Sequence, residues 1–295
     1  MNLSALCQGE PVPFYPGVTP GMPRETYDRI PALSCTVLKK WLSLGEIPSK
    51  FAYWMRTRWE ETPSEAMLIG NALDWRLLGS LFSSKYAIAP KLDRRTTAGK
   101  LAWQGFKSAN KDKIVLTADQ GEKVEAMAES VRTAETADGI LSNCKKMVLC
   151  GELWGFPCKA ELDLFTPNSE HILDLKTTRD VSEDWFGKAF IDLGYHYQAS
   201  FYLALAKACG LDKTCFDFLC VENEAPWTCM VHCFDLEDFD HRLLYDACLI
   251  RLERAATEIA ARLETNNFTN SKDWKPVKVP EWALHQAKLE TLAIL

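Results

Sequence analysis

Residues 158–180, CKAELDLFTPNSEHILDLKTTRD, contain two apolar runs with strand-like alternation on either side of the turn sequence Pro-Asn-Ser. Because side chains alternate across a strand, Asp163 shares a face with Glu161, and Asp174 shares a face with Lys176. A hairpin that turns symmetrically about the Asn-Ser pair sets Asp163 opposite Asp174, and Glu161 opposite Lys176. The stretch therefore predicts a β-hairpin with its charged side chains on one side.

Two carboxylates that face each other across a strand pair repel, and the repulsion grows as they lose water. A divalent cation that prefers oxygen ligands would relieve it, and Mg²⁺ typically binds few protein carboxylates and keeps waters for a substrate. Lys176 beside such an ion can orient an attacking water and neutralise charge on a phosphoryl oxygen. On spacing alone, exposed strand aspartates with Lys176 paired to one of them explain the pattern equally well.

The segments outside the hairpin set the fold class. Apolar positions three and four residues apart predict helices at 34–45, 48–59, 66–82, 117–141, 182–210 with a break near Gly194, and 236–264. Further strands are expected at 147–154, 214–222 and 228–234. Residues 91–100 have the composition of a basic loop. The class is therefore α/β or α+β, with a central mixed sheet flanked by helices.

The expected domain organisation is simple. Residues 1–24 are rich in Pro and Gly and predict an extended N-terminal arm, which a single domain over residues 25–295 follows. The expected parts of that domain are a helical part at 25–145, a catalytic core at 146–235, and a C-terminal helix and tail at 236–295.

The composition is that of an ordinary globular protein. Of 295 residues, 47% are apolar and 25% are charged, and the net charge of −6 argues against a uniformly basic nucleic-acid binder. No apolar run is long enough to span a bilayer and the N-terminus lacks a secretion signal, so a cytoplasmic location is expected. The 11 cysteines are odd in number, and the spacing of Cys215, Cys220, Cys229 and Cys233 includes no C-x-x-C. Reduced, mostly buried thiols are therefore expected instead of disulfides or a metal cluster.

Asp163, the triplet Asp174-Leu-Lys176, and Gln198 with Tyr202 occur in an order and spacing that resembles the PD-(D/E)xK nuclease superfamily. The resemblance is to the branch that includes the RecB nuclease domain and lambda exonuclease, and more narrowly to the phage exodeoxyribonuclease VIII (RecE-type) family. Collinear stretches between about residues 27 and 210 carry the narrower resemblance: IPALSCTVLKKWL, ETPSEAMLIGNALDW, DRRTTAGKLAWQGF and ILDLKTTRD.

The resemblance implies a restriction-endonuclease-like core and a Mg²⁺-dependent exonuclease, for which Mn²⁺ can substitute. It implies processive 5′-3′ digestion of linear double-stranded DNA, which leaves a 3′ overhang for an annealing recombinase. It also implies a homo-oligomeric ring, a trimer or tetramer, encoded by a phage or prophage and working in the bacterial cytoplasm without membrane contact. An endonuclease or structure-specific nuclease, and a catalytically weakened DNA- or protein-binding protein, are the alternatives.

The same resemblance implies roles for the matching residues. Those implied in catalysis are Lys176, Asp163, Asp174, Glu152, Gln198 and Tyr202. The implied metal ligands are Asp163, Asp174, the backbone carbonyl of Leu175, Asp74 and Glu152. Gln198 and Tyr202, one helical turn apart, would contact the DNA backbone or brace the lysine.

Two residues depart from the family pattern. The family usually has histidine where Asp74 stands, and an aspartate there can bind Mg²⁺ but alters metal preference or weakens the enzyme. The family commonly has arginine where Glu161 stands, so the pocket is expected to be more acidic and less favourable to phosphate. Basic residues elsewhere are then the expected DNA contacts: Arg94, Arg95, Lys100 and Arg179. Trp103 or Phe106 could wedge apart a DNA strand end, but core packing is the favoured expectation for both.

Overall fold

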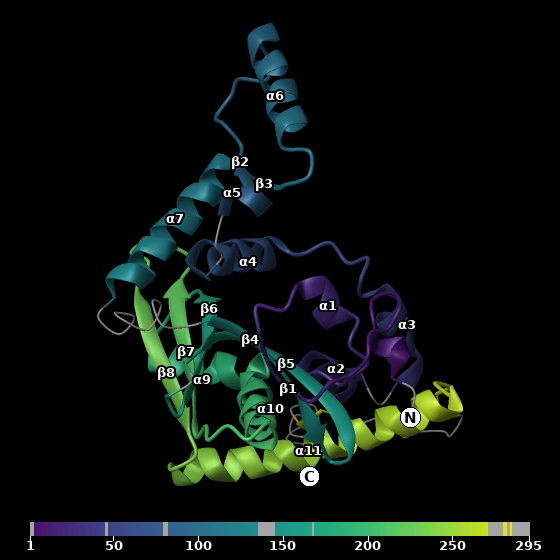
Figure 1. The fold of residues 1–295 in the computed structure, drawn as a ribbon. Coiled ribbons are helices and arrows are strands. Elements are labelled where there is room, and N and C mark those ends of the chain that lie inside the picture. Colours follow the sequence, from purple (N-terminus) through teal and green to yellow (C-terminus); the bar gives the residue numbers. More distant parts are fainter. Residues whose placement is uncertain are drawn as a thin grey trace, which may run out of the picture.

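The computed structural model describes residues 3–44, 47–78, 82–134, 145–166, 168–270, 280, 281 and 284. At its centre is a six-stranded sheet in the order β1-β4-β5-β6-β7-β8 (Figure 1). Its strands are β1 (Gly17–Pro20), β4 (Lys145–Leu153), β5 (Phe156–Phe165), β6 (His171–Thr178), β7 (Cys215–Glu222) and β8 (Cys229–Asp235). Neighbouring strands are antiparallel except for β6 and β7, which are parallel. The expected fold class, with a central mixed sheet, is confirmed.

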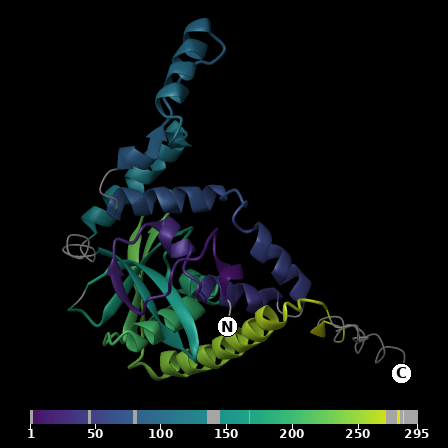
Figure 2. The same cartoon turned by 45° about the vertical axis from the view of Figure 1, so that its right-hand side comes forward.

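Helices cover both faces of this sheet, as Figures 1 and 2 show together. One face packs against α2 (Cys35–Leu44), α10 (Tyr195–Ala208) and α11 (Phe239–Thr265). The other packs against α4 (Glu65–Leu78) and α7 (Ala118–Thr133). Among the described residues, none of these helices is both long and apolar enough to cross a membrane.

Strand β7 is buried on both faces, as expected of a strand in the middle of a covered sheet. Phe216 and Phe218 point toward α10 and α11, whereas Leu219 and Val221 point toward α4 and α7. Each buried apolar side chain of this size contributes about 1.5–3 kcal/mol. The parallel neighbour β6 is therefore held firmly along its length, which matters because β6 carries three of the predicted site residues: Asp174, Leu175 and Lys176.

The N-terminal segment is part of the packed structure and does not project as a separate arm. A 3-10 helix at Ser4–Leu6 follows Leu3. Leu3 and Leu6 are both buried in the core cluster that also includes residues of α3 (Pro48–Thr57). Strand β1 pairs with β4 and forms one edge of the sheet. The Pro and Gly content of residues 1–24 suggested only extended backbone, and α1 (Arg24–Asp28) follows directly.

A segment between α4 and α7 projects away from the sheet, at the top of Figures 1 and 2. It consists of α5 (Phe82–Lys85), β2 (Tyr86–Ile88), α6 (Thr97–Ala109) and β3 (Ile114–Leu116), and β2 and β3 form a separate parallel pair. The basic-loop prediction for residues 91–100 was therefore wrong from Thr97 onward. The Thr96 side chain accepts a hydrogen bond from the Gly99 backbone and begins the helix.

Trp103 and Phe106 were expected in the core, and that expectation was wrong. They lie on α6, half exposed, with their rings stacked 5.5 Å apart. The guanidinium of Arg94 lies 4.3 Å from the Trp103 ring. These two aromatic residues therefore support the projecting segment itself.

The helix boundaries largely follow the predicted ranges. Thr117 and Gln120 form a reciprocal capping box at the start of α7, which ends at Thr133; the predicted continuation over 135–141 lies outside the described residues. The helical region after β6 breaks as predicted, into α9 (Glu183–Asp192) and α10. Gly194 sits between them with a φ of 66°, a conformation that favours glycine.

Candidate active site

The site begins where strands β5 and β6 separate. Their paired residues are Leu164 with Leu173, and Phe165 with Ile172, which is the register that the sequence predicted. The next pair in this register is Asp163 and Asp174, but the ladder ends before it. Beyond that point β5 remains paired with β4 and β6 with β7, so the two aspartates flank a gap between neighbouring strands.

A β-bulge reorients the chain at the same place. Met147 of β4 faces Leu162, but the next pair along joins positions 145 and 165, so β5 carries one residue more than β4. Asp163 and Leu164 together oppose Lys146. Bulges bend a strand and change the direction of its side chains. The strict alternation predicted for residues 159–165 is therefore broken at Asp163.

Asp174 is almost fully buried and has two polar neighbours. Its Oδ2 contacts the Nζ of Lys176, and its Oδ1 accepts a 2.7 Å hydrogen bond from Nε2 of Gln198 on α10. Burial raises the pKa of Asp174 to about 6, even though Lys176 and Gln198 both favour the ionised form. The nearby Asp163 adds to the increase. A carboxylate held this way gains more from a cation than an exposed one does.

Lys176 lies beside this carboxylate with 19% of its side chain exposed, and its Nζ is 5.0 Å from the centre of the Tyr195 ring. Burial acts to lower the pKa of Lys176, but the carboxylates of Asp174 and Asp163 outweigh it and leave the pKa raised. The side chain is therefore an ammonium at neutral pH. Lys176 can supply positive charge and donate hydrogen bonds, and it does not act as a neutral base in this state.

Asp74 reaches the site from α4, on the opposite side from Gln198. The Nζ of Lys146 lies 2.6 Å from Oδ2 of Asp74 and 3.7 Å from Oδ1 of Asp163. The structure thus brings Asp74 and Asp163 together around one ammonium. Sequence reasoning missed Lys146, although a lysine that opens an apolar strand next to an acidic strand is a detectable signal.

These residues fit a divalent cation. Among the described residues, the buried Oδ1 of Asp74 has no hydrogen-bond partner. Burial raises the pKa of Asp74 and the neighbouring Asp163 raises it further, while Lys146 opposes both. The carboxylates of Asp74 and Asp163, which both approach the Lys146 ammonium and include this free buried oxygen, are the donor type that Mg²⁺ or Mn²⁺ prefers. In this structure the Lys146 ammonium, which carries one positive charge, lies near the carboxylates of both Asp74 and Asp163.

The pocket is less acidic than expected, because a cationic side chain compensates the negative charge of Glu161. Arg24 of α1 donates a 3.0 Å hydrogen bond to Glu161 and also pairs with Asp28 at 3.0 Å. The extra carboxylate is therefore largely neutralised from a segment far away in sequence. The predicted disadvantage for phosphate approach is reduced accordingly.

Glu152 is not brought to the site, which corrects the prediction that it binds metal or positions water. It faces Pro157 near the turn between β4 and β5. Six residues of β5 separate Pro157 from Asp163, which at the usual rise of a strand is roughly 20 Å. The upstream acidic position of the family pattern therefore has no counterpart in Glu152.

The remaining predicted residues divide into two groups. Gln198 contacts Asp174 directly, whereas Tyr202 packs edge to face against Phe216 with ring centroids 5.7 Å apart. Burial raises the pKa of Tyr202 well above its usual value, so its hydroxyl stays protonated. Leu175 lies between the two charged residues of β6 and its side chain packs toward α4 and α7; the ligand role of its carbonyl stays a prediction.

A cavity of about 400 Å³ adjoins the site beyond Lys176. Its lining includes Arg179 at the end of β6, Lys188 of α9, and the aromatic side chains of Trp185 and Tyr195. Three cationic side chains beside aromatic rings suit a nucleic-acid strand. The other predicted DNA contacts, Arg94, Arg95 and Lys100, lie on the projecting segment, away from this cavity.

Comparisons with known proteins agree with this arrangement. Residues 34–247 match the family described as "PDDEXK-like domain of unknown function" (DUF3799). No curated protein matches the sequence. Among solved structures, the chain is similar to a crystal structure described as a "putative exonuclease" from Eubacterium rectale. That likeness has a TM-score of 0.53 at 15% sequence identity and covers 84% of this chain and 91% of the other. At this identity, the likeness supports the fold.

Proposed function

The chain belongs to the DUF3799 family of PDDEXK-like domains, and from this premise we propose that it is a Mg²⁺-dependent deoxyribonuclease that digests linear double-stranded DNA from its ends. The observation that carries the proposal is the convergence of Asp163, Asp174 and Lys176 at the gap between β5 and β6. A structural role alone does not explain why two carboxylates and a half-buried ammonium lie together where a sheet ladder ends.

The residues divide the work of phosphodiester hydrolysis. A bound Mg²⁺ would polarise the phosphoryl oxygen and lower the pKa of a coordinated water. Asp163, Asp174 and Asp74 would supply oxygen ligands for it. Lys176, as an ammonium, donates a hydrogen bond to the attacking water or to a phosphoryl oxygen. Its positive charge stabilises the negative charge that develops there. Gln198 fixes the carboxylate of Asp174 through its 2.7 Å hydrogen bond.

The DNA strand is proposed to approach through the cavity beside Lys176. Arg179 and Lys188 line it and would neutralise backbone phosphates on either side of the scissile bond. Trp185, also in the lining, offers a ring on which a base can stack. The projecting segment with Arg94 and Lys100 would contact duplex farther from the cut.

The finer proposals follow the resemblance to the phage RecE-type family. They are 5′-3′ polarity, a 3′ overhang for an annealing recombinase, and a ring-shaped trimer or tetramer around DNA. The Eubacterium rectale protein is described as a "putative exonuclease", and its likeness to this chain is an analogy at the level of the fold. Sedimentation of the protein as a monomer alone, with and without DNA, would contradict the ring.

A second candidate is a DNA-binding protein with a weakened nuclease site. Lys146 favours it, because an ammonium 2.6 Å from Asp74 competes with a metal for the same carboxylates. Under this alternative, DNA binding persists in EDTA and no product forms with Mg²⁺ or Mn²⁺.

The test compares three substrates with Mg²⁺ and with EDTA: linear duplex labelled at the 5′ ends, the same duplex labelled at the 3′ ends, and covalently closed circular DNA. The proposal predicts Mg²⁺-dependent release of the 5′ label as mononucleotide or short product, and an intact circle. Cleavage of the circle would establish an endonuclease instead. Absence of product from every substrate, with Mg²⁺ and also with Mn²⁺, would refute the proposed nuclease activity.

A further inference from the structure

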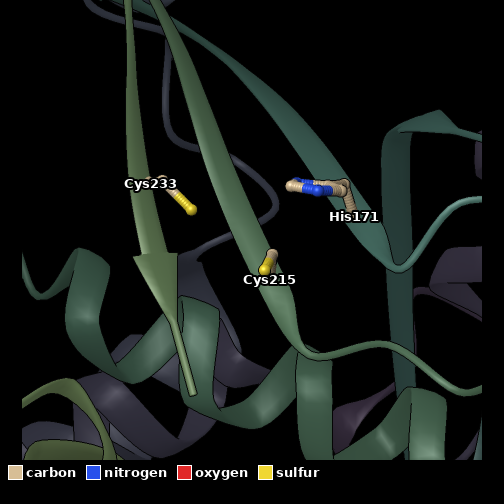
Figure 3. A group of neighbouring side chains, drawn as sticks. All are labelled: His171, Cys215 and Cys233. Atoms are coloured by element: carbon tan, nitrogen blue, oxygen red, sulfur yellow. The ribbon is translucent and has the colours of Figure 1, made fainter. Parts of the chain in front are cut away.

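A second cluster of metal-ligating side chains lies at the far end of β6, β7 and β8, outside the proposed nuclease site. Figure 3 shows His171 of β6, Cys215 of β7 and Cys233 of β8 on three neighbouring strands, with the imidazole and the Cys233 thiol pointing toward each other. One ligand atom from each residue lies within 4.8 Å of the other two. The strand register creates this grouping, because His171 pairs with Cys215 and Cys233 pairs with Asp217.

Asp217 supplies a carboxylate beside this group of three. Asp217, two residues beyond Cys215 on β7, is buried with 7% of its surface exposed. Its Oδ2 lies 2.7 Å from Nδ1 of His171. Among the described residues, its other oxygen, Oδ1, is buried without a hydrogen-bond partner. A buried carboxylate oxygen without a partner is costly, and a cation beside it removes the cost.

We propose that His171, Cys215, Cys233 and Asp217 form a zinc site that fastens the ends of β6, β7 and β8. Two thiolates, an imidazole and a carboxylate are the donor types that Zn²⁺ binds in tetrahedral sites, whereas Mg²⁺ does not take thiolate ligands. A tetrahedral ion with Zn–S of about 2.3 Å and Zn–N of about 2.0 Å separates its ligand atoms by about 3.6–3.8 Å. The ligand atoms of His171, Cys215 and Cys233, which lie within 4.8 Å of one another, therefore need to move closer together by up to about 1 Å.

Two carboxylates, those of Asp217 and Asp235, place negative charge beside the cluster. Burial raises the pKa of Cys215, and the carboxylates of Asp235 and Asp217 raise it further. Burial and Asp217 likewise raise the pKa of Cys233. A divalent ion that binds here would displace the thiol protons and pair with the resulting thiolates and with the carboxylate of Asp217. Cys233 is exposed, so the ion has access from solvent.

The position gives the site a structural consequence. His171 precedes Asp174 by three residues on the same strand, so an ion here would fix the start of β6 relative to β7 and β8. The cysteine spacing alone did not reveal the site, because His171 lies 44 residues before Cys215 and only the sheet unites them.

The experiment titrates purified protein with Co²⁺ in a phosphine reductant and excess Mg²⁺, which occupies the carboxylate site and leaves thiolates free. Wild type is expected to bind one Co²⁺ per chain with a thiolate-to-cobalt charge-transfer band in the near ultraviolet, and Zn²⁺ should displace it. Cys233→Ser and His171→Ala should each weaken Zn²⁺ binding by at least about tenfold. Cys229→Ser, a half-buried cysteine on the same strand, should bind as wild type does.

Thermal unfolding gives a second readout that does not depend on nuclease activity. Zn²⁺ should raise the Tm of wild type and of Cys229→Ser but not that of Cys233→Ser. The proposal is overturned if wild type shows no thiolate band, or if Cys233→Ser and His171→Ala both retain it. A disulfide between Cys215 and Cys233 in the reduced preparation would overturn it as well. These results do not test the proposed nuclease site, because none of the variants changes a residue of that site.

Discussion

Lys146→Met tests whether the ammonium occupies the place of the divalent cation. The Nζ of Lys146 lies 2.6 Å from Asp74 and 3.7 Å from Asp163, and the three side chains are 21–31% exposed. Removing one partner of a fully buried ion pair costs about 3–5 kcal/mol, so for these partly exposed groups we expect about 2 kcal/mol. The metal-free variant should therefore unfold about 5 °C below wild type.

The same change should strengthen metal binding. Without Lys146, the two carboxylates repel each other and no ammonium has to be displaced. The stability lost in EDTA should return when Mg²⁺ binds, which corresponds to an apparent affinity about 30-fold higher than that of wild type. Isothermal titration with Mg²⁺ and Mn²⁺, and thermal unfolding in EDTA and in MgCl₂, measure the two effects independently.

Lys91→Met is the matched control, since Lys91 pairs with Glu122 at 2.7 Å on the exposed surface of the projecting segment. Its metal affinity and its Tm should equal those of wild type, because an exposed ion pair contributes little to stability. Equal or weaker Mg²⁺ affinity in Lys146→Met would refute the idea that the ammonium stands in for the ion. Lys146 would then be a structural pair or a phosphate contact.

Three further predictions follow from the same contacts. Gln198→Leu removes a hydrogen bond to the ionised carboxylate of Asp174, so its pKa should rise and the acidic limb of the activity profile should move up by about one pH unit; an unchanged limb would contradict this. The pKa of Asp174 is raised from 3.8 to about 6 by burial, so the metal-free protein should lose about 3 kcal/mol of stability as the pH rises from about 4 to 6. Asp174→Asn should lack that component in denaturation curves compared across the same pH range. Lys159, buried with a pKa lowered to about 8, donates to the carbonyls of Tyr27 and Ile30 at 2.7 and 2.9 Å; Lys159→Met should therefore cost about 2–3 kcal/mol in urea unfolding, and a changed Mg²⁺ affinity would count against its structural role.

Local patterns predicted the central part of the fold well. The hairpin register followed from alternation and turn chemistry, and the observed pairs, Leu164 with Leu173 and Phe165 with Ile172, are in the predicted register. The break at Gly194 and the cap at Thr117 likewise came from rules that involve only neighbouring residues. Such features are predictable because their causes lie within a few positions in the chain.

Features that depend on distant contacts were not predictable. The bulge at Asp163 arises from the pairing of β5 with β4, and Lys146 joins the site only through that pairing and the packing of α4. Arg24 neutralises Glu161 across 137 residues of sequence. Glu152 was expected at the site from its order in the chain, yet the length of the β4–β5 hairpin places it at the opposite end.

The central claim concerns the two aspartates and the lysine of the strands β5 and β6. The most direct measurement is the initial rate of nucleotide release from end-labelled linear duplex DNA in Mg²⁺ by wild type, Asp174→Ala, Lys176→Ala and Glu152→Gln. The account predicts at least about a hundredfold loss for the first two variants and near wild-type rates for Glu152→Gln, which lies remote from the site. Wild-type rates with Lys176→Ala or Asp174→Ala would contradict it.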